Sequence, residues 1–96
     1  MIEKLDGPAR RAALAELPNW REAADRDAIE RSLKFNNFDA AFAFMTQVAA
    51  EADRADHHPE WFNVYNRVDI LLTTHEVDGL SRRDIELAGF IDRLVD

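Results

Sequence analysis

The sequence predicts an α+β domain in which a four-stranded, mainly antiparallel sheet carries three helices on one face, in the order α-β-β-α-β-β-α. Two stretches predict the strands, because apolar and polar residues alternate over 28–35 and again over 68–73, which is the period of a half-buried strand. Capping residues that precede segments of helical apolar spacing predict the helices. Each alternating stretch follows another strand-like segment, so we expect two hairpins separated by a long helix.

The first half of the chain supplies one helix and one hairpin. Asp6 is a good helix N-cap and Pro8 falls in the first turn, so we expect a short helix that runs to Leu17. Residues 20–24 form the shorter strand and pair with 28–35 through an acidic turn.

The main helix is expected over residues 40–54, with Asn37 or Asp39 as its N-cap. Its apolar residues form two stripes, which are Phe42, Met45 and Ala49 in the first and Phe44 and Val48 in the second. One sheet can cover only one stripe. We expect the stripe with Phe44 and Val48 to face a second subunit, which predicts a homodimer or homotetramer. The alternative is a helix packed deeply within one chain.

The second half supplies another hairpin and the last helix. Residues 61–66 and 68–73 predict a hairpin with its turn at 66–67. Ser81 to Asp84 then follow the Ser-x-x-acid pattern of a helix N-terminus, and helical spacing continues to the end of the sequence.

Composition narrows the class of protein. A chain of 96 residues is one domain over 1–96, and its 47% hydrophobic content supports a core. The net charge of −7 argues against direct binding to nucleic acid or to an anionic membrane surface. The chain has no cysteine, which excludes disulfides and thiolate chemistry. No apolar signal core and no stretch of roughly 18 apolar residues occurs. We therefore expect a cytoplasmic protein.

All three histidines lie between positions 57 and 75. His57 and His58 precede Pro59, so they should be extended rather than helical. A hairpin brings the entry of its first strand beside the exit of its second, which places His75 near the other two. Histidine both donates and accepts protons near neutral pH, so we expect a shared acid–base site. The alternative is a set of unrelated surface or capping residues.

A metal site is not expected among these histidines. Successive side chains in an extended segment point to opposite sides, so His57 and His58 are badly placed to hold one ion together. There is no cysteine to complete a thiolate site.

The residues around the histidines also resemble a known family. The matching runs are D-H-H-P-E-W-F-N-V-Y-N over 56–66, T-H-E over 74–76, G-L-S over 79–81 and R-D-I over 83–85. Together they resemble pterin-4a-carbinolamine dehydratase, whose animal members double as the dimerisation cofactor of a hepatocyte homeodomain transcription factor. The resemblance covers most of the chain.

The resemblance implies an α+β fold and dehydration of 4a-hydroxytetrahydrobiopterin to quinonoid dihydropterin and water, in support of aromatic amino acid hydroxylases. It implies no metal or other cofactor. Catalytic roles carry over to His57, His58 and His75. Pterin contacts carry over to Asp56, Pro59, Trp61, Thr73, Thr74 and Glu76. Asp56 also has a purely structural interpretation, as a residue that ends the main helix. A dimerisation module for a regulatory protein is the competing function.

Overall fold

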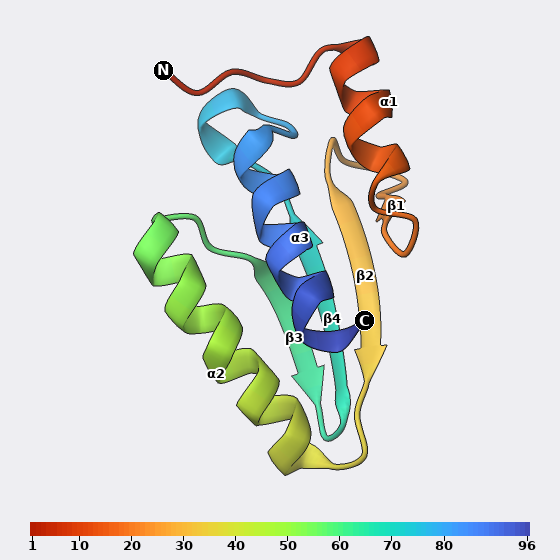
Figure 1. Ribbon diagram of the computed structural model, residues 1–96, viewed down its shortest axis with the longest axis vertical. Helices are drawn as coiled ribbons and strands as arrows, with labels where there is room; N and C mark the ends of the chain where they lie inside the picture. Colours follow the sequence, from red (N-terminus) through yellow and green to blue (C-terminus); the bar gives the residue numbers. More distant parts are fainter.

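Four antiparallel strands form one sheet in the spatial order β1-β2-β4-β3 (Figure 1). The computed structural model describes all residues 1–96. Its elements are α1 (Gly7–Ala15), β1 (Arg21–Glu22), β2 (Ile29–Lys34), α2 (Phe38–Ala55), β3 (Glu60–Val64), β4 (Arg67–Leu72), the 3-10 turn η1 (His75–Val77) and α3 (Arg82–Val95). The predicted fold class and element order are confirmed.

Helices α2 and α3 cross one face of the sheet, while α1 lies beside β1 at the sheet edge (Figure 1). Strands β2 and β4 pair in register from Ile29 opposite Leu72 to Lys34 opposite Arg67. This register directs Ile29, Ile70 and Leu72 toward the helices, where all three are fully buried. The core therefore lies between this sheet face and the two longer helices.

The residues predicted as N-caps do cap the helices. Asp6 accepts a hydrogen bond from the Ala9 amide at 2.8 Å, and Asn37 accepts one from the Ala40 amide at 2.8 Å, so Asn37 rather than Asp39 caps α2. Each cap satisfies an amide that the helix leaves without a partner.

The predicted orientation of α2 is wrong. Phe44 and Val48 are buried within the chain at 4% and 0% exposure, whereas Phe42 is 54% exposed. The buried stripe follows helical spacing through Ala41, Phe44, Val48 and Ala52. Two alanines on that stripe let the helix approach the core closely, so the smaller side chains mark the buried face. Phe44 also packs against Phe35, with ring centroids 5.1 Å apart.

The second hairpin turns one residue earlier than predicted. Val64 pairs with Arg67, so Tyr65 and Asn66 form the two-residue turn. Tyr65 has φ 48°, the left-handed conformation that two-residue hairpin turns require. The Asn66 side chain donates to the Phe35 carbonyl at 2.8 Å and ties this turn to the end of β2.

An inward-facing arginine interrupts the alternation of β2. Arg31 forms ion pairs with Asp92 and Asp96 at the end of α3, at 2.5 and 2.7 Å. Hydrogen bonds from these carboxylates raise the pKa of Arg31. The Trp20 indole donates to the same Asp92 at 2.8 Å. The arginine thus fastens the last turn of α3 to β2.

The orientation of α2 gives a stability test. We expect Phe44→Ala to lower the free energy of unfolding by about 3–5 kcal/mol, because it leaves a cavity in the core. Phe42→Ala should cost less than about 1 kcal/mol in the monomer, since half of that side chain is already in water. Urea unfolding of both variants measures the difference, and equal losses would contradict the observed orientation.

Candidate active site

The three histidines surround one pocket at the end of the sheet where α2 leads into β3 and β4 leads into η1. The pocket has a volume of about 200 Å³. Its lining residues are Asp56, His57, His58, Thr73, His75 and Glu76. The hairpin of β3 and β4 thus brings together histidines that lie up to 18 positions apart in the sequence (75 minus 57).

A left-handed residue ends α2 immediately before the two adjacent histidines. Asp56 has φ 52° and ψ 44° and forms the C-cap of α2, a conformation that aspartate tolerates better than most residues. Beyond it, His57 donates its amide to the Ala52 carbonyl at 3.0 Å. His57 then lies inside, with its side chain 8% exposed, while the His58 side chain is 57% exposed. One dipeptide therefore supplies a buried and an exposed imidazole.

Each histidine has its own carboxylate partner. The His57 Nε2 lies 2.6 Å from Asp84 Oδ1, and the His58 Nε2 lies 2.8 Å from Asp53 Oδ1. The His75 Nε2 lies 3.2 Å from Glu60 Oε2. An ionised carboxylate only accepts hydrogen bonds, so a contact of this kind needs a proton on Nε2, carried either by the neutral Nε2–H tautomer or by the charged ring.

The partner of His57 is fully buried. Asp84 Oδ2 accepts hydrogen bonds from the Thr74 hydroxyl at 2.7 Å and from the Ser81 amide at 3.0 Å. The Thr74 and Ser81 hydroxyls also share a hydrogen bond of 2.6 Å. This group, which we name the Asp84 network, consists of His57, Thr74, Ser81 and Asp84.

Some of the other residues predicted to contact the pterin line the pocket, and others lie outside it. Thr73 lines the pocket, and its hydroxyl donates to the Asp27 carbonyl at 2.9 Å. Thr74 lies behind His57 with its side chain directed at Asp84. Pro59 and Trp61 are outside the lining of the pocket, and Trp61 packs against the core instead.

The partner of His75 is exposed and is held by an arginine from a distant turn. Arg26 donates two hydrogen bonds to Glu60, at 2.8 and 2.9 Å. These bonds, together with the contact from His75, lower the pKa of Glu60 to about 2. Glu60 therefore remains ionised beside His75 throughout the neutral range.

Sequence reasoning missed Arg26, Asp53, Glu60 and Asp84 as neighbours of the histidines. Asp84 carried a signal, since it occupies the acidic position of the predicted capping pattern, and the structure has both halves of that capping box. Glu60 lies within the matched run over 56–66 but was not singled out. Nothing in the local sequence pattern points to Arg26, which reaches Glu60 across 34 positions.

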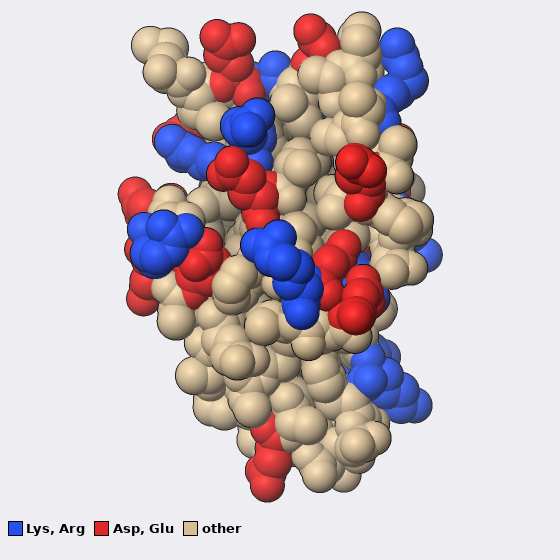
Figure 2. Space-filling view, viewed as in Figure 1, with Lys and Arg blue, Asp and Glu red and all other residues tan.

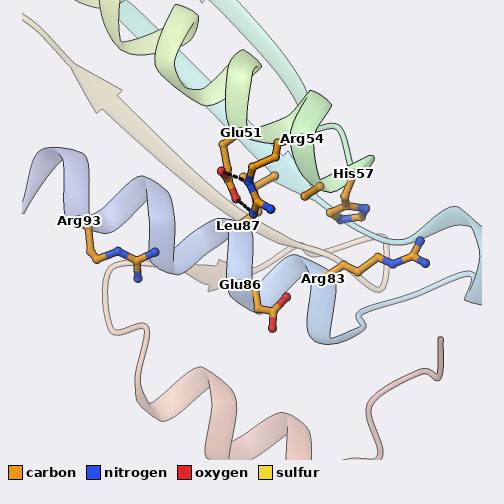
Figure 3. Close-up of a pocket in the computed structure, with 8 residues that line it drawn as sticks. Glu51, Arg54, His57, Arg83, Glu86, Leu87 and Arg93 are labelled. Carbon is orange, nitrogen blue, oxygen red and sulfur yellow. Dashed lines mark hydrogen bonds and ion pairs between the residues drawn. The ribbon is translucent and has the colours of Figure 1, made fainter. Parts of the chain in front are cut away.

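A larger groove lies between the end of α2 and the facing side of α3, with a volume of about 500 Å³. Figure 3 shows Glu51 and Arg54 facing each other on α2, with Glu86 and Arg93 on α3 and the His57 ring at one end. The groove lacks His58 and His75, so the smaller pocket is the one that collects the acid–base groups. His57 lines both cavities.

The Glu60 contact predicts a pH dependence of stability. Folding lowers the pKa of Glu60 from its usual 4.5 to about 2, so its contribution is complete above about pH 4.5 and is lost as the pH falls toward 2. Because Glu60 is 44% exposed, solvent screening limits this to roughly 0.2–1 kcal/mol. Glu60→Gln should flatten the fall in unfolding free energy between these pH values.

The control for this measurement is Glu30→Gln, which removes a half-buried carboxylate that is also paired with an arginine, Arg21, at 3.1 Å. Urea unfolding at pH 6 and pH 2.5 compares the three proteins. A Glu60→Gln variant with the same pH slope as the wild type would contradict the role of Arg26 at this carboxylate.

Comparison with known proteins identifies relatives over nearly the whole chain. The family described as pterin 4 alpha carbinolamine dehydratase matches residues 3–94. A Burkholderia vietnamiensis protein provisionally named pterin-4-alpha-carbinolamine dehydratase is 58% identical over 94 residues, which is 98% of this chain and 92% of that protein. A Burkholderia orbicola protein with the same provisional name is 60% identical over 92 residues, or 96% and 90% of the two chains.

A solved structure extends the likeness to three dimensions. The crystal structure of a transcriptional coactivator/pterin dehydratase from Brucella melitensis superposes with a TM-score of 0.93 at 43% identity, covering 97% of this chain and 99% of that one. No helix of the present chain has the length and apolar character that a bilayer crossing needs. The family match over nearly the whole sequence and the shared fold show that this chain belongs to the pterin-4a-carbinolamine dehydratase family.

Proposed function

We propose that the protein dehydrates 4a-hydroxytetrahydropterin to quinonoid dihydropterin and water, and so supports recycling of the tetrahydropterin that aromatic amino acid hydroxylases consume. The observation that carries the proposal is the pocket lined by three histidines, each with a carboxylate on its Nε2, in a chain of this family. We further propose that it acts in the cytoplasm.

The reaction fits a site built from imidazoles. Loss of water from a carbinolamine requires a proton for the departing hydroxyl and removal of one from the neighbouring N5–H. Two imidazoles in opposite protonation states can do both near pH 7. We assign this pair to His57 and His75, and we assign His58 to orienting the pterin.

Pterin binding is proposed for the polar groups of the same pocket. Asp56, Thr73 and Glu76 line it directly. Glu76 is held by Arg83 at 3.0 Å, which fixes a carboxylate that can accept hydrogen bonds from the amino and ring N–H groups of a pterin. Pro59 and Trp61 remain candidates for contacts that arise when the ligand is bound.

We also propose a homodimer or homotetramer. Phe38 and Phe42 form an exposed aromatic pair on α2, with ring centroids 5.6 Å apart. In Figure 2 the part of the surface over the first turns of α2 carries few charged side chains. Strand β3 is an edge of the sheet and can pair with another strand. These two surfaces replace Phe44 and Val48 as the proposed contacts.

A protein-binding function is the second candidate. The exposed aromatic pair on α2 favours it, because exposed apolar patches often mark interaction sites. The solved Brucella relative is described as a coactivator as well as a dehydratase. Turnover of the carbinolamine by the purified protein separates the candidates, since a binding module alone would leave the rate of its spontaneous decay unchanged.

Substitution of the histidines tests the enzymatic proposal. We expect His57→Ala and His75→Ala each to reduce kcat for carbinolamine dehydration by about 10²–10⁴-fold, the usual contribution of a positioned general acid or base. Spectrophotometric decay of the carbinolamine measures the rate, and circular dichroism checks that each variant is folded. Full activity in both variants would reject the assigned roles.

Substitution on α2 tests the assembly. Phe42→Glu should lower the sedimentation coefficient at micromolar concentration, because a charge replaces an exposed apolar contact, while dehydration at the distant histidine pocket continues. Lys34→Glu, which also introduces an acid at an exposed position but on β2, is the control. A wild-type protein that sediments as an 11.0 kDa monomer would contradict the proposed oligomer.

A further inference from the structure

Asp84 is the most enclosed carboxylate of the molecule, with no exposed surface. A buried charge is strongly disfavoured unless it is paired and hydrogen-bonded. Two neutral donors, the Thr74 hydroxyl and the Ser81 amide, satisfy Oδ2. The remaining oxygen, Oδ1, contacts His57 Nε2 at 2.6 Å, and His57 is the one ionisable group to which Asp84 is bonded.

Helix capping explains only half of these contacts. In a capping box the acidic side chain accepts from the amide of the N-cap residue, which here is Ser81 bonded to Oδ2. Oδ1 takes no part in that cap, yet it lies inside the protein and is directed at His57. A carboxylate needed only for the cap could face solvent, as Asp6 does at the start of α1.

We propose that Asp84 is a positioning residue that holds His57 in the Nε2–H tautomer, so that Nδ1 is the nitrogen that exchanges a proton with the substrate. Thr74 and Ser81 fix the carboxylate from behind. The inference rests on the proposed function, because it names how one histidine of that site is oriented. It also reassigns Thr74 from a pterin contact to support of His57.

The carboxylate partners of the other two histidines are open to solvent. Asp53 beside His58 is 82% exposed, and Glu60 beside His75 is 44% exposed, so water competes for both contacts. The charged and titratable groups that line the two cavities beside His57 are Glu51, Arg54, Arg83, Glu86 and Arg93 in the groove and Asp56, His58, His75 and Glu76 in the pocket. Arg54 and Arg83 are bonded to Glu51 and Glu76, which leaves Asp84 as the bonded partner of the His57 ring.

Asp84→Asn tests the proposal. An asparagine can still accept from Ser81 and Thr74 through its oxygen, but its NH₂ then faces His57 and favours the Nδ1–H tautomer. The corresponding replacement in Ser-His-Asp triads lowers kcat on the order of 10⁴-fold. We expect kcat for carbinolamine dehydration to fall at least about 100-fold with a small change in KM.

The matched control is Asp92→Asn, the same chemical change at the opposite end of α3. Asp92 is partly buried and bonded to Arg31 and Trp20, so its loss also weakens the packing of α3. It lies outside the histidine pocket. We expect its kcat to stay within about threefold of the wild type. An equal fall in kcat in both variants would overturn the proposal in favour of a purely structural role.

A spectroscopic measurement on the wild-type protein needs neither the substrate nor either variant. Long-range ¹H–¹⁵N spectra of the histidine rings in the wild-type protein above pH 7.5 should give the Nε2–H pattern for His57. The opposite pattern would overturn the proposal even if Asp84→Asn did not fold. If the wild type shows Nε2–H but does not dehydrate the carbinolamine, the proposed function fails while the positioning by Asp84 stands.

Discussion

The hydrogen bonds of the Asp84 carboxylate join three parts of the chain that lie far apart in the sequence or belong to different elements. They connect the start of α3 to the exit of β4 at Thr74 and to the loop that carries His57. Moving such a charge into the interior costs several kcal/mol unless its oxygens are satisfied. The fold therefore has to bring β4, α3 and the end of α2 into one arrangement, and that arrangement also creates the pocket.

Much of the fold could be predicted because its signals are local. Alternation over 28–35 and 68–73, the caps at Asp6 and Ser81, and the order of elements depend on neighbouring residues. The orientation of α2 could not, because it depends on which stripe packs most closely against a sheet built from other segments. We expected the stripe with Phe44 and Val48 to face a second subunit, whereas the alanines at 41 and 52 allow that same stripe to pack closely on the core.

The site also combines features that the sequence predicts with features that depend on distant residues. The grouping of His57, His58 and His75 follows from hairpin connectivity, which sequence patterns reveal. Their carboxylate partners are reached across 5 positions for Asp53, 15 for Glu60 and 27 for Asp84, and no periodicity encodes the longer contacts. The capping pattern located Asp84 on the helix, but one carboxylate oxygen is enough for a cap, so the pattern gives no information about the other.

The residue at position 56 can serve two purposes, a left-handed backbone turn and a negative charge. Its backbone conformation, with φ 52°, suits glycine and asparagine as well as aspartate, whereas only aspartate places a negative charge at the mouth of the pocket. The residues that can replace Asp56 therefore show whether the backbone turn or the carboxylate is needed. A chain that accepts glycine there needs only the change in direction between His57 and α2, whereas a chain that accepts aspartate alone also uses the carboxylate.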